Sequence, residues 1–99
     1  MDLVDQIIEK RDAIKEICAR HGASAVRVFG SCARNDYDEK SDIDILVDVA
    51  LDRGWFGLRR LNDIEDELTE LLGRKVDVWT PKLLKGKIRE RAFKEAISL

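Results

Sequence analysis

The chain has 99 residues, which is enough for one small domain spanning 1–99 and no more. Its formal net charge of -2 argues against a general nucleic-acid-binding protein, so no direct DNA binding is expected. No apolar run approaches the length of a membrane span and no signal-peptide pattern is present, so we expect a cytoplasmic protein with no membrane contact.

The first predicted element is an amphipathic helix that begins near Leu3. Apolar residues recur at spacings of three and four as far as Cys18, and Gly22 is the expected C-terminal stop. The segment 25–29 is short, β-branched and aromatic, which is typical of a strand, and a brief helix is expected over 31–36.

The clearest predicted strand covers residues 42–49. One of its faces is wholly apolar, whereas the other carries three acids and one leucine. The apolar face consists of Ile43, Ile45, Val47 and Val49, and the other face of Asp42, Asp44, Leu46 and Asp48. This alternation indicates a strand that packs one face against a core.

A loop is predicted over residues 51–57, where Trp55 and Phe56 lie between two glycines. Three interpretations of this aromatic pair are open. The rings could stack on a nucleobase, dock on a partner protein, or fold back over the core.

The rest of the chain predicts helix, strand and helix. A leucine-rich helix covers 58–72, and a third strand covers 75–79. Thr80 and Pro81 are a good start for the last helix, because a hydroxyl caps the N-terminus and proline suits the first position. The expected buried line of this helix is Leu84, Ile88, Ala92 and Ala96, with Phe93 and Ile97 beside it.

This order of elements predicts an α/β (α+β) fold, with a short mixed sheet and helices packed on one face. The strands over 42–49 and 75–79 are expected side by side, because a strand-helix-strand crossover usually places both strands in one sheet.

Charge is unevenly spread, since residues 82–99 carry six Lys or Arg and two Glu.

Three acids in this arrangement require an explanation. Asp42 and Asp44 project from the same strand face, and Asp77 joins them if its strand is the neighbour. Two like charges 4 Å apart repel by about 4 kcal/mol at an effective dielectric near 20, so a cation is needed to offset them. Magnesium suits the task, because it takes one or two carboxylates and completes its shell with water and phosphate oxygens. The alternative is that Asp42 caps the strand and the other two acids are solvated surface groups.

A second feature lies ten residues upstream of the paired acids. Gly30 and Ser31 form a turn before the predicted short helix, and such a turn offers backbone N–H groups to a phosphate. Together, the turn and the acids predict a site for a metal-bound nucleotide.

At this point the sequence resembles a known family. The segments GSCAR (30–34) and SDIDILV (41–47) resemble the signature of the nucleotidyltransferase superfamily, whose best-known member is DNA polymerase β. The segment LLGRKVDV (71–78) and the end of the chain narrow the resemblance to the minimal nucleotidyltransferases. These are short prokaryotic proteins often paired with a HEPN-domain toxin in toxin–antitoxin modules. Many relatives have glycine where this chain has Asn35, a residue that tolerates positive φ.

The resemblance implies transfer of a nucleoside monophosphate from a magnesium-bound nucleoside triphosphate to a hydroxyl, with release of pyrophosphate. Asp42 and Asp44 would hold the metal ions, two in number, and Asp77 would be a third metal ligand and the base for the acceptor hydroxyl. Gly30, Ser31 and Arg34 would bind the nucleotide phosphates. The alternative role for Arg34 is a structural ion pair with Asp36, Asp38 or Asp42.

Three functional hypotheses follow from the resemblance. The first is an antitoxin that transfers AMP from ATP to a tyrosine of a HEPN toxin. The second is a non-catalytic antitoxin that covers its partner sterically. The third is a nucleotidyltransferase of the aminoglycoside-modifying type, although those enzymes carry a further domain.

The two cysteines have structural interpretations. Cys18 lies on the apolar stripe of the first helix, and Cys32 has no histidine in sequence reach, because His21 is the chain's one histidine. Two cysteines at this spacing make neither a disulfide framework nor a zinc site.

Overall fold

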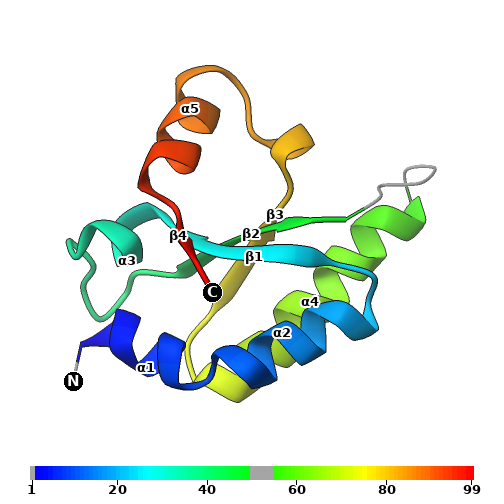
Figure 1. The fold of residues 1–99 in the computed structure, drawn as a ribbon, viewed down its shortest axis with the longest axis horizontal. Helices are drawn as coiled ribbons and strands as arrows, with labels where there is room; N and C mark the ends of the chain where they lie inside the picture. Colours follow the sequence, from blue (N-terminus) through cyan, green and yellow to red (C-terminus); the bar gives the residue numbers. More distant parts are fainter. Residues whose placement is uncertain (1, 50–54) are drawn as a thin grey trace.

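The computed structural model describes residues 2–49 and 55–99, with the side chains of residues 55 and 56 outside that description. Its elements, in chain order, are α1 (Leu3–Glu9), α2 (Arg11–Arg20), β1 (Ser24–Phe29), α3 (Gly30–Arg34), β2 (Ile43–Asp48), α4 (Trp55–Leu72), β3 (Val76–Trp79), the 3-10 turn η1 (Pro81–Leu83), α5 (Gly86–Glu95) and β4 (Ile97–Ser98). Figure 1 shows α1, α2 and α4 on one side of the sheet and α5 on the other.

The sheet has four strands in the order β3-β2-β1-β4. β1 runs antiparallel to both β2 and β4, whereas β2 and β3 run parallel and are joined through α4. The predicted mixed sheet is therefore confirmed. The predicted crossover is confirmed as well, since it brings β2 and β3 together as neighbours.

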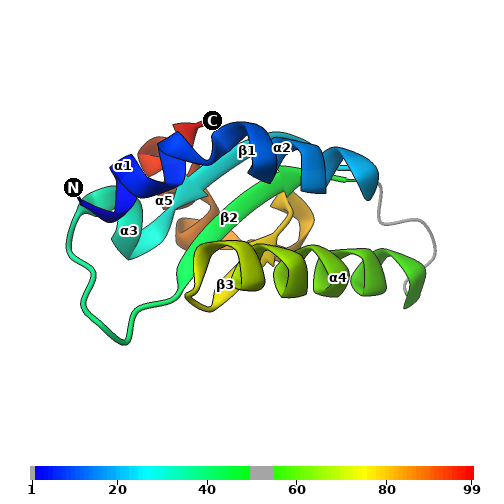
Figure 2. The same cartoon turned by 90° about the horizontal axis from the view of Figure 1, so that it is seen from below.

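The larger core lies between the sheet and the helices α1, α2 and α4. Figure 2 shows α2 and α4 side by side across this face of the sheet. Its fully buried side chains include Ile7, Ile14, Cys18, Val28, Ile43, Ile45, Val47, Ile64 and Leu68. The apolar face of the strand predicted over 42–49 thus packs as the alternation requires.

A smaller core covers the opposite face of the sheet. Leu46, which alternates with the acids, is fully buried there against Phe29, Leu84 and Ala92. These contacts attach η1 and α5 to the face that carries the acids. Two residues of the buried line expected for the last helix, Leu84 and Ala92, are indeed buried. The prediction that Ile88 is buried is wrong, because 67% of its surface is exposed.

Several element boundaries differ from the sequence-based expectation. The first helix breaks at Lys10, which lets α1 turn towards α3 while α2 follows β1. The expected loop over 51–57 is too long, because α4 already begins at Trp55. The last helix is split: Thr80 caps η1 through its hydroxyl, which accepts from the Lys82 N–H, and α5 starts only at Gly86.

Strand β4 was not predicted. It pairs with β1 through only two residues, Ile97 and Ser98, so its pattern is too short to recognise in a sequence. In the part of the chain that is described, no helix has the length and apolar character needed to cross a lipid bilayer.

Candidate active site

Asp44 and Asp77 lie next to each other on neighbouring parallel strands. The register of β2 and β3 makes the two residues direct partners, so their side chains leave the same face of the sheet. Adjacent strands are about 4.8 Å apart, which brings two carboxylates within reach of one another. The prediction that Asp77 lies beside the paired acids is therefore confirmed for Asp44, because the crossover through α4 makes β2 and β3 neighbours.

Asp42 stands just before β2 and joins the same group. The ammonium of Lys75 lies 3.8 Å from Asp42 Oδ2 and 3.8 Å from Asp77 Oδ1, so one cation bridges both acids. Burial raises the pKa of Asp77; Lys75 lowers it, and the Asp42 carboxylate raises it again. The three acids are thus close enough to influence each other electrostatically.

Gly30 makes room for the Asp44 carboxylate. Its φ is 74°, a conformation that glycine adopts without strain. A Cβ built on Gly30 would collide with Asp44 Oδ2 and lie 3.2 Å from Asp44 Cγ. The turn that starts α3 therefore needs glycine for two reasons, its dihedral angle and the acid behind it.

The pKa of Asp44 is raised by its surroundings. Burial is the largest cause that raises its pKa, and the nearby Asp77 and Asp42 raise it further, whereas the Trp79 indole N–H and Arg34 lower it. Within the described residues, the buried Trp79 Nε1–H has no hydrogen-bond partner of standard geometry. A positive charge at this place would stabilise the ionised carboxylate.

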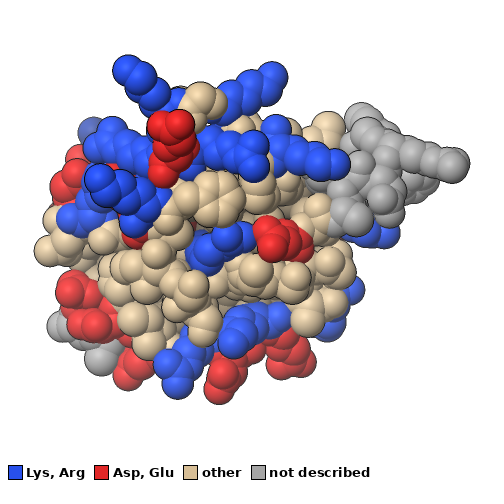
Figure 3. Space-filling view, turned by 45° about the horizontal axis from the view of Figure 1, so that its top comes forward, with Lys and Arg blue, Asp and Glu red and all other residues tan. Residues whose placement is uncertain are grey.

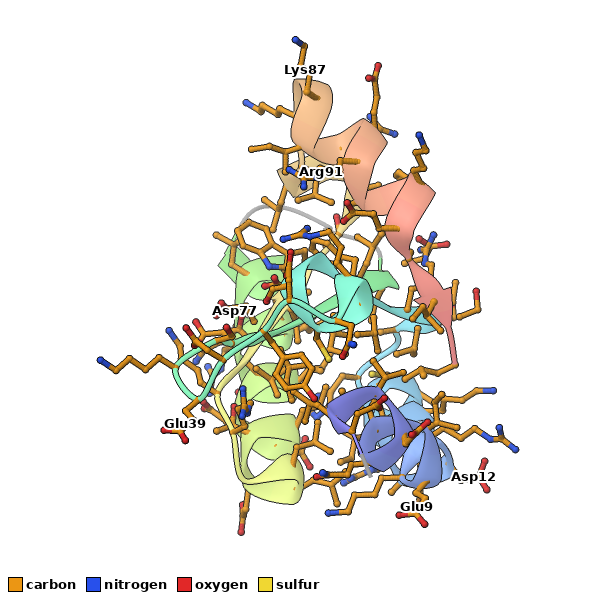
Figure 4. All side chains as sticks on the ribbon, turned by 90° about the vertical axis from the view of Figure 1, so that its left-hand side faces the viewer. Glu9, Asp12, Glu39, Asp77, Lys87 and Arg91 are labelled. Atoms are coloured by element: carbon orange, nitrogen blue, oxygen red, sulfur yellow. The ribbon has the colours of Figure 1, made fainter. Side chains whose placement is uncertain are left out.

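A hollow of about 340 Å³ lies beside Asp44, between α3 and α5. Gly30, Ser31, Arg34 and Arg91 line it, so the two predicted phosphate-binding residues after Gly30 share one space. Figure 4 shows Arg91 on α5 above Asp77, while Lys87, near the N-terminal end of the same helix, points away from the molecule. The hollow thus combines backbone N–H groups with two guanidinium groups.

Arg34 is held by ion pairs at the edge of this hollow. Its Nε donates to Asp36 Oδ2 at 3.1 Å, and its Nη1 donates to Glu95 Oε2 at 3.0 Å. The pair with Asp36 is one of the alternatives named from the sequence, whereas the pair with Glu95 needs the tertiary structure. These two contacts leave Arg34 beside Asp44, close enough to lower the pKa of that acid.

The residues present fit a magnesium ion by their chemistry. Carboxylate oxygens are the ligands that Mg²⁺ prefers, and the hollow between α3 and α5 leaves space beside Asp44. In residues 2–49 and 55–99, however, no group of three or more His, Cys, Asp or Glu side chains is already arranged to hold a metal. Lys75 lies between two of the acids instead, so metal binding by Asp42, Asp44 and Asp77 stays a prediction.

Two further hollows adjoin the acids. One of about 410 Å³ lies between Asp44, Trp79 and Ile88, under η1 and α5. The other, of about 300 Å³, lies on the far side of Trp79 and includes Asp77. Asp44 and Asp77 therefore line concave surfaces, and small ligands usually bind in such places.

Basic side chains gather on the outer surface of α5. Figure 3 shows Lys and Arg along this edge of the molecule. The exposed basic residues of the helix are Lys87, Arg89, Arg91 and Lys94. These residues belong to the basic end of the chain, and Arg91 among them lines the hollow beside Asp44.

The sequence analysis did not predict three contacts of the site. These are the ion pairs of Lys75 with Asp42 and Asp77, the position of the Trp79 indole beside Asp44, and the ion pair of Glu95 with Arg34. Lys75 is two residues before Asp77, and residues two apart in a strand lie on the same face. This alternation could have predicted that Lys75 lies beside Asp77. Glu95 comes from α5, and nothing in the sequence placed that helix over α3. The three interpretations of Trp55 and Phe56 concern side chains outside the described residues.

Comparisons with known proteins identify the family. A model described as "Nucleotidyltransferase domain" matches residues 10–99. This chain belongs to the nucleotidyltransferase domain family. The resemblance noted in the sequence is thereby confirmed, and the chain is a nucleotidyltransferase.

Curated relatives of this nucleotidyltransferase are of similar length. A Methanocaldococcus jannaschii protein named "Putative protein adenylyltransferase MJ0435" is 38% identical over 93 residues, which cover 94% of this chain and 97% of the relative. "Protein adenylyltransferase MntA" of Thermococcus cleftensis is 35% identical over 83 residues, covering 84% of this chain and 81% of the relative.

Solved structures agree with this assignment. "Structure of putative minimal nucleotidyltransferase" superposes with a TM-score of 0.78 at 40% identity, covering 100% of this nucleotidyltransferase and 97% of that chain. "Crystal structure of the toxin-antitoxin with AMP-PNP" gives a TM-score of 0.69 at 19% identity, covering 88% and 69% of the two chains. The second likeness concerns the fold alone, and the first shows the minimal nucleotidyltransferase fold.

Proposed function

We propose that this nucleotidyltransferase is a magnesium-dependent protein adenylyltransferase that acts as an antitoxin in the cytoplasm. It transfers AMP from ATP to a hydroxyl, namely a tyrosine of a HEPN-domain toxin. The observation that carries the proposal is the pairing of Asp44 with Asp77 in front of the Gly30 turn. The names of relatives, protein adenylyltransferases among them, support the same reaction.

The triphosphate lies in the hollow between α3 and α5 in this proposal. Ser31 and the backbone after Gly30 donate hydrogen bonds to its outer phosphates, because a turn into a helix presents free N–H groups. Arg34 and Arg91 supply positive charge, and the planar guanidinium suits phosphate oxygens. Arg34 exchanges one of its carboxylate partners for phosphate when the nucleotide binds.

The transfer is an in-line displacement at the α-phosphorus. The acceptor oxygen forms a bond to that phosphorus, the bond to the oxygen bridging to the β-phosphate breaks, and pyrophosphate leaves with the electron pair. Asp77 accepts the proton of the attacking hydroxyl. Asp42, Asp44 and Asp77 would hold Mg²⁺, which supplies the positive charge that the crowded carboxylates and the phosphates require.

The acceptor side of the site is open enough for a macromolecule. The hollow that includes Asp77 is bordered by the exposed side chains of Leu58 and Leu83, so we place a partner protein over the acids. The solved toxin–antitoxin structure with AMP-PNP has the same fold, and this supports both a nucleotide substrate and a toxin partner.

The test uses the protein together with the product of its genomic neighbour, ATP and MgCl₂. We expect the neighbour to gain the mass of one or more AMP groups in intact mass spectrometry, and to gain none when EDTA is present. The double variant Asp42→Asn, Asp44→Asn should lose more than 100-fold in rate while the complex with the neighbour stays intact. Asp48→Asn is the matched control, because Asp48 lies on the same strand face but pairs with Arg27 at 2.8 Å instead.

The outcome distinguishes a catalytic antitoxin from one that blocks its partner sterically. Retained protection against the toxin in the double variant, with no added mass on the neighbour, would assign the protein to the non-catalytic alternative. AMP on a small soluble product rather than on the neighbour would assign it to the aminoglycoside-modifying type.

A further inference from the structure

The loop between α3 and β2 leads the chain into Asp42. It covers residues 35–42, and Figure 2 shows it passing from α3 to the start of β2. Asp42 is the last residue of this loop, one position before the pairing of β2 with β3 begins at Ile43. Its position therefore depends on how the loop is held, and not on the strand pairing that places Asp44.

Arg74 reaches this loop from the turn between α4 and β3. Its Nη1 donates to the carbonyl oxygen of Asp38 at 2.8 Å and to that of Ser41 at 3.0 Å. Its guanidinium carbon lies 5.8 Å from the centre of the Tyr37 ring, which is within the range of a cation–π contact. One half-buried side chain thus holds the loop at three of its residues.

The residues that Arg74 binds form a closed turn of their own. The Asp38 carboxylate accepts from the Lys40 N–H at 2.8 Å and from the Ser41 hydroxyl at 3.1 Å. The Asp38 N–H in turn donates to Ser41 Oγ at 2.9 Å. Arg74 binds the carbonyl groups at both ends of this turn, so the turn and the guanidinium form one unit.

The two peptide groups that flank Asp42 are both held by neighbouring residues of one segment. The Ser41 carbonyl belongs to the planar peptide group that precedes Asp42, and the guanidinium binds it. The next peptide group contains the Ile43 N–H, which donates to the Lys75 carbonyl at 2.9 Å. Asp77 follows Lys75 by two residues. The short segment before β3 therefore determines where Asp42 stands relative to Asp77.

We propose that Arg74 is a positioning residue for Asp42 in nucleotide transfer. It fixes the turn of the loop to the segment before β3, so that the Asp42 carboxylate stays beside Asp44 and Asp77. The inference rests on the proposed function, since it takes Asp42 as one of the acids that act on the nucleotide. A reacting group misplaced by about 1 Å can cost about 100-fold in rate, so release of the loop should slow transfer.

The anchor is tested first without any reaction, in the variant Arg74→Met. We expect the amide hydrogens of Lys40 and Ser41 to exchange about tenfold faster in NMR, because the turn is released. The Val76 N–H, which donates to Thr69 Oγ1 at 3.0 Å, should keep its exchange rate and so report that β3 is intact. Unchanged exchange at Lys40 and Ser41 would overturn the inference.

Transfer is then measured with ATP and the product of the genomic neighbour as acceptor. Arg74→Met should lower kcat about tenfold or more. The KM for ATP should stay close to that of the wild type, because the residues that we propose for the phosphates line the hollow between α3 and α5.

Gly73→Ala is the matched control for stability. Gly73 is the neighbour of Arg74 in the chain, and its φ of 69° is strained for any residue with a Cβ. This variant should lose stability and keep its kcat. Equal losses of kcat in Gly73→Ala and Arg74→Met would assign the effect to stability and overturn the positioning role.

Arg74→Lys keeps the test decisive if the methionine variant does not fold. The lysine side chain is shorter, and its ammonium lacks the planar group that lies over Tyr37, so we expect kcat to fall about threefold at a similar KM for ATP. A wild-type kcat in Arg74→Lys would then overturn the inference.

The two proposals fail in different ways. Faster exchange in the loop with an undiminished kcat in Arg74→Met would remove the positioning role and leave the adenylyltransferase in place. Faster exchange in the loop, together with no transfer by the wild type to any acceptor, would remove the enzyme and keep Arg74 as the anchor of the loop.

Discussion

Single residues decide the shape of the acidic site, and Gly30 is the clearest case. The dihedral angle and the collision with Asp44 both act at this position, whereas Gly73 has a φ of 69° and no described atom lies within 4 Å of an added Cβ. Comparing the two glycines separates backbone strain from loss of space.

Gly73→Ala should lose about 1 kcal/mol of stability, the cost of a left-handed dihedral angle for a residue with a Cβ, and keep its transfer rate. Gly30→Ala should lose more stability and at least tenfold in rate, because Asp44 must move. Urea denaturation and a pyrophosphate-release assay measure both quantities. Equal stability losses in the two variants would show that the collision with Asp44 is relieved without cost.

Asn35 is a second residue whose left-handed backbone conformation could be expected from the sequence. It ends α3 with a φ of 62°, so asparagine takes the left-handed position where many relatives have glycine. The sequence expectation that the turn survives is confirmed. Ala25 also has a positive φ, 51°, at an irregularity of β1, and no sequence signal announced it.

Lys75 lies 3.8 Å from both Asp42 and Asp77, so it would compete with the divalent cation that we propose there. A unit charge about 4 Å from a carboxylate contributes about 1 kcal/mol in water, and Lys75 is 70% exposed, so solvent screens it strongly. Lys75→Met should therefore tighten Mg²⁺ binding severalfold and lower the melting temperature measured in EDTA. Thermal unfolding across a MgCl₂ titration checks both effects, and an unchanged Mg²⁺ midpoint would contradict the competition.

At the scale of elements, the attachment of η1 and α5 positions the nucleotide side of the site. These elements hold to the sheet through the small core of Phe29, Leu46, Leu84 and Ala92. Glu95 adds an ion pair to Arg34, which ties the end of α5 to α3. The hollow in which we propose that the triphosphate binds therefore depends on a core far smaller than the main one.

Leu84→Ala should cost about 2 kcal/mol, the low end for such a change, because the small core lies near the surface. Amide hydrogen exchange should rise in α5 while α2 and α4 keep their protection. Leu83→Ala is the matched control, since Leu83 is partly exposed and should change stability by less than about 0.5 kcal/mol. Equal losses in the two variants would show that η1 is not anchored through Leu84.

At the scale of the whole molecule, both thiols report on global unfolding. Cys18 and Cys32 are fully buried, and burial raises the pKa of each to about 11. At pH 8 only about one thiol in a thousand would be ionised at such a pKa, so burial and protonation both prevent alkylation.

Iodoacetamide at pH 8 should modify neither cysteine of the native protein within an hour and both in urea. Intact mass spectrometry gives the count of modified thiols, and the native rate should rise with denaturant as the unfolded population rises. Rapid modification of Cys32 alone in the folded protein would indicate local opening of α3 next to the site.

The sequence by itself determined the strand with alternating faces, the glycine turn before the short helix, the crossover and the three acids. Apart from the crossover, these features are local, since they follow from the period of two in a strand and from the few residues that permit a left-handed turn. The crossover follows from the general rule that a strand-helix-strand unit places both strands in one sheet. The tertiary structure decided the position of α5 over the acidic face, the ion pairs of Lys75 and Glu95, and the pairing of β4 with β1. Apart from the pair of Lys75 with Asp77, those contacts join residues far apart in the chain. The position of α5 depends on the burial of Leu46 and Leu84, which no periodicity within one segment can show.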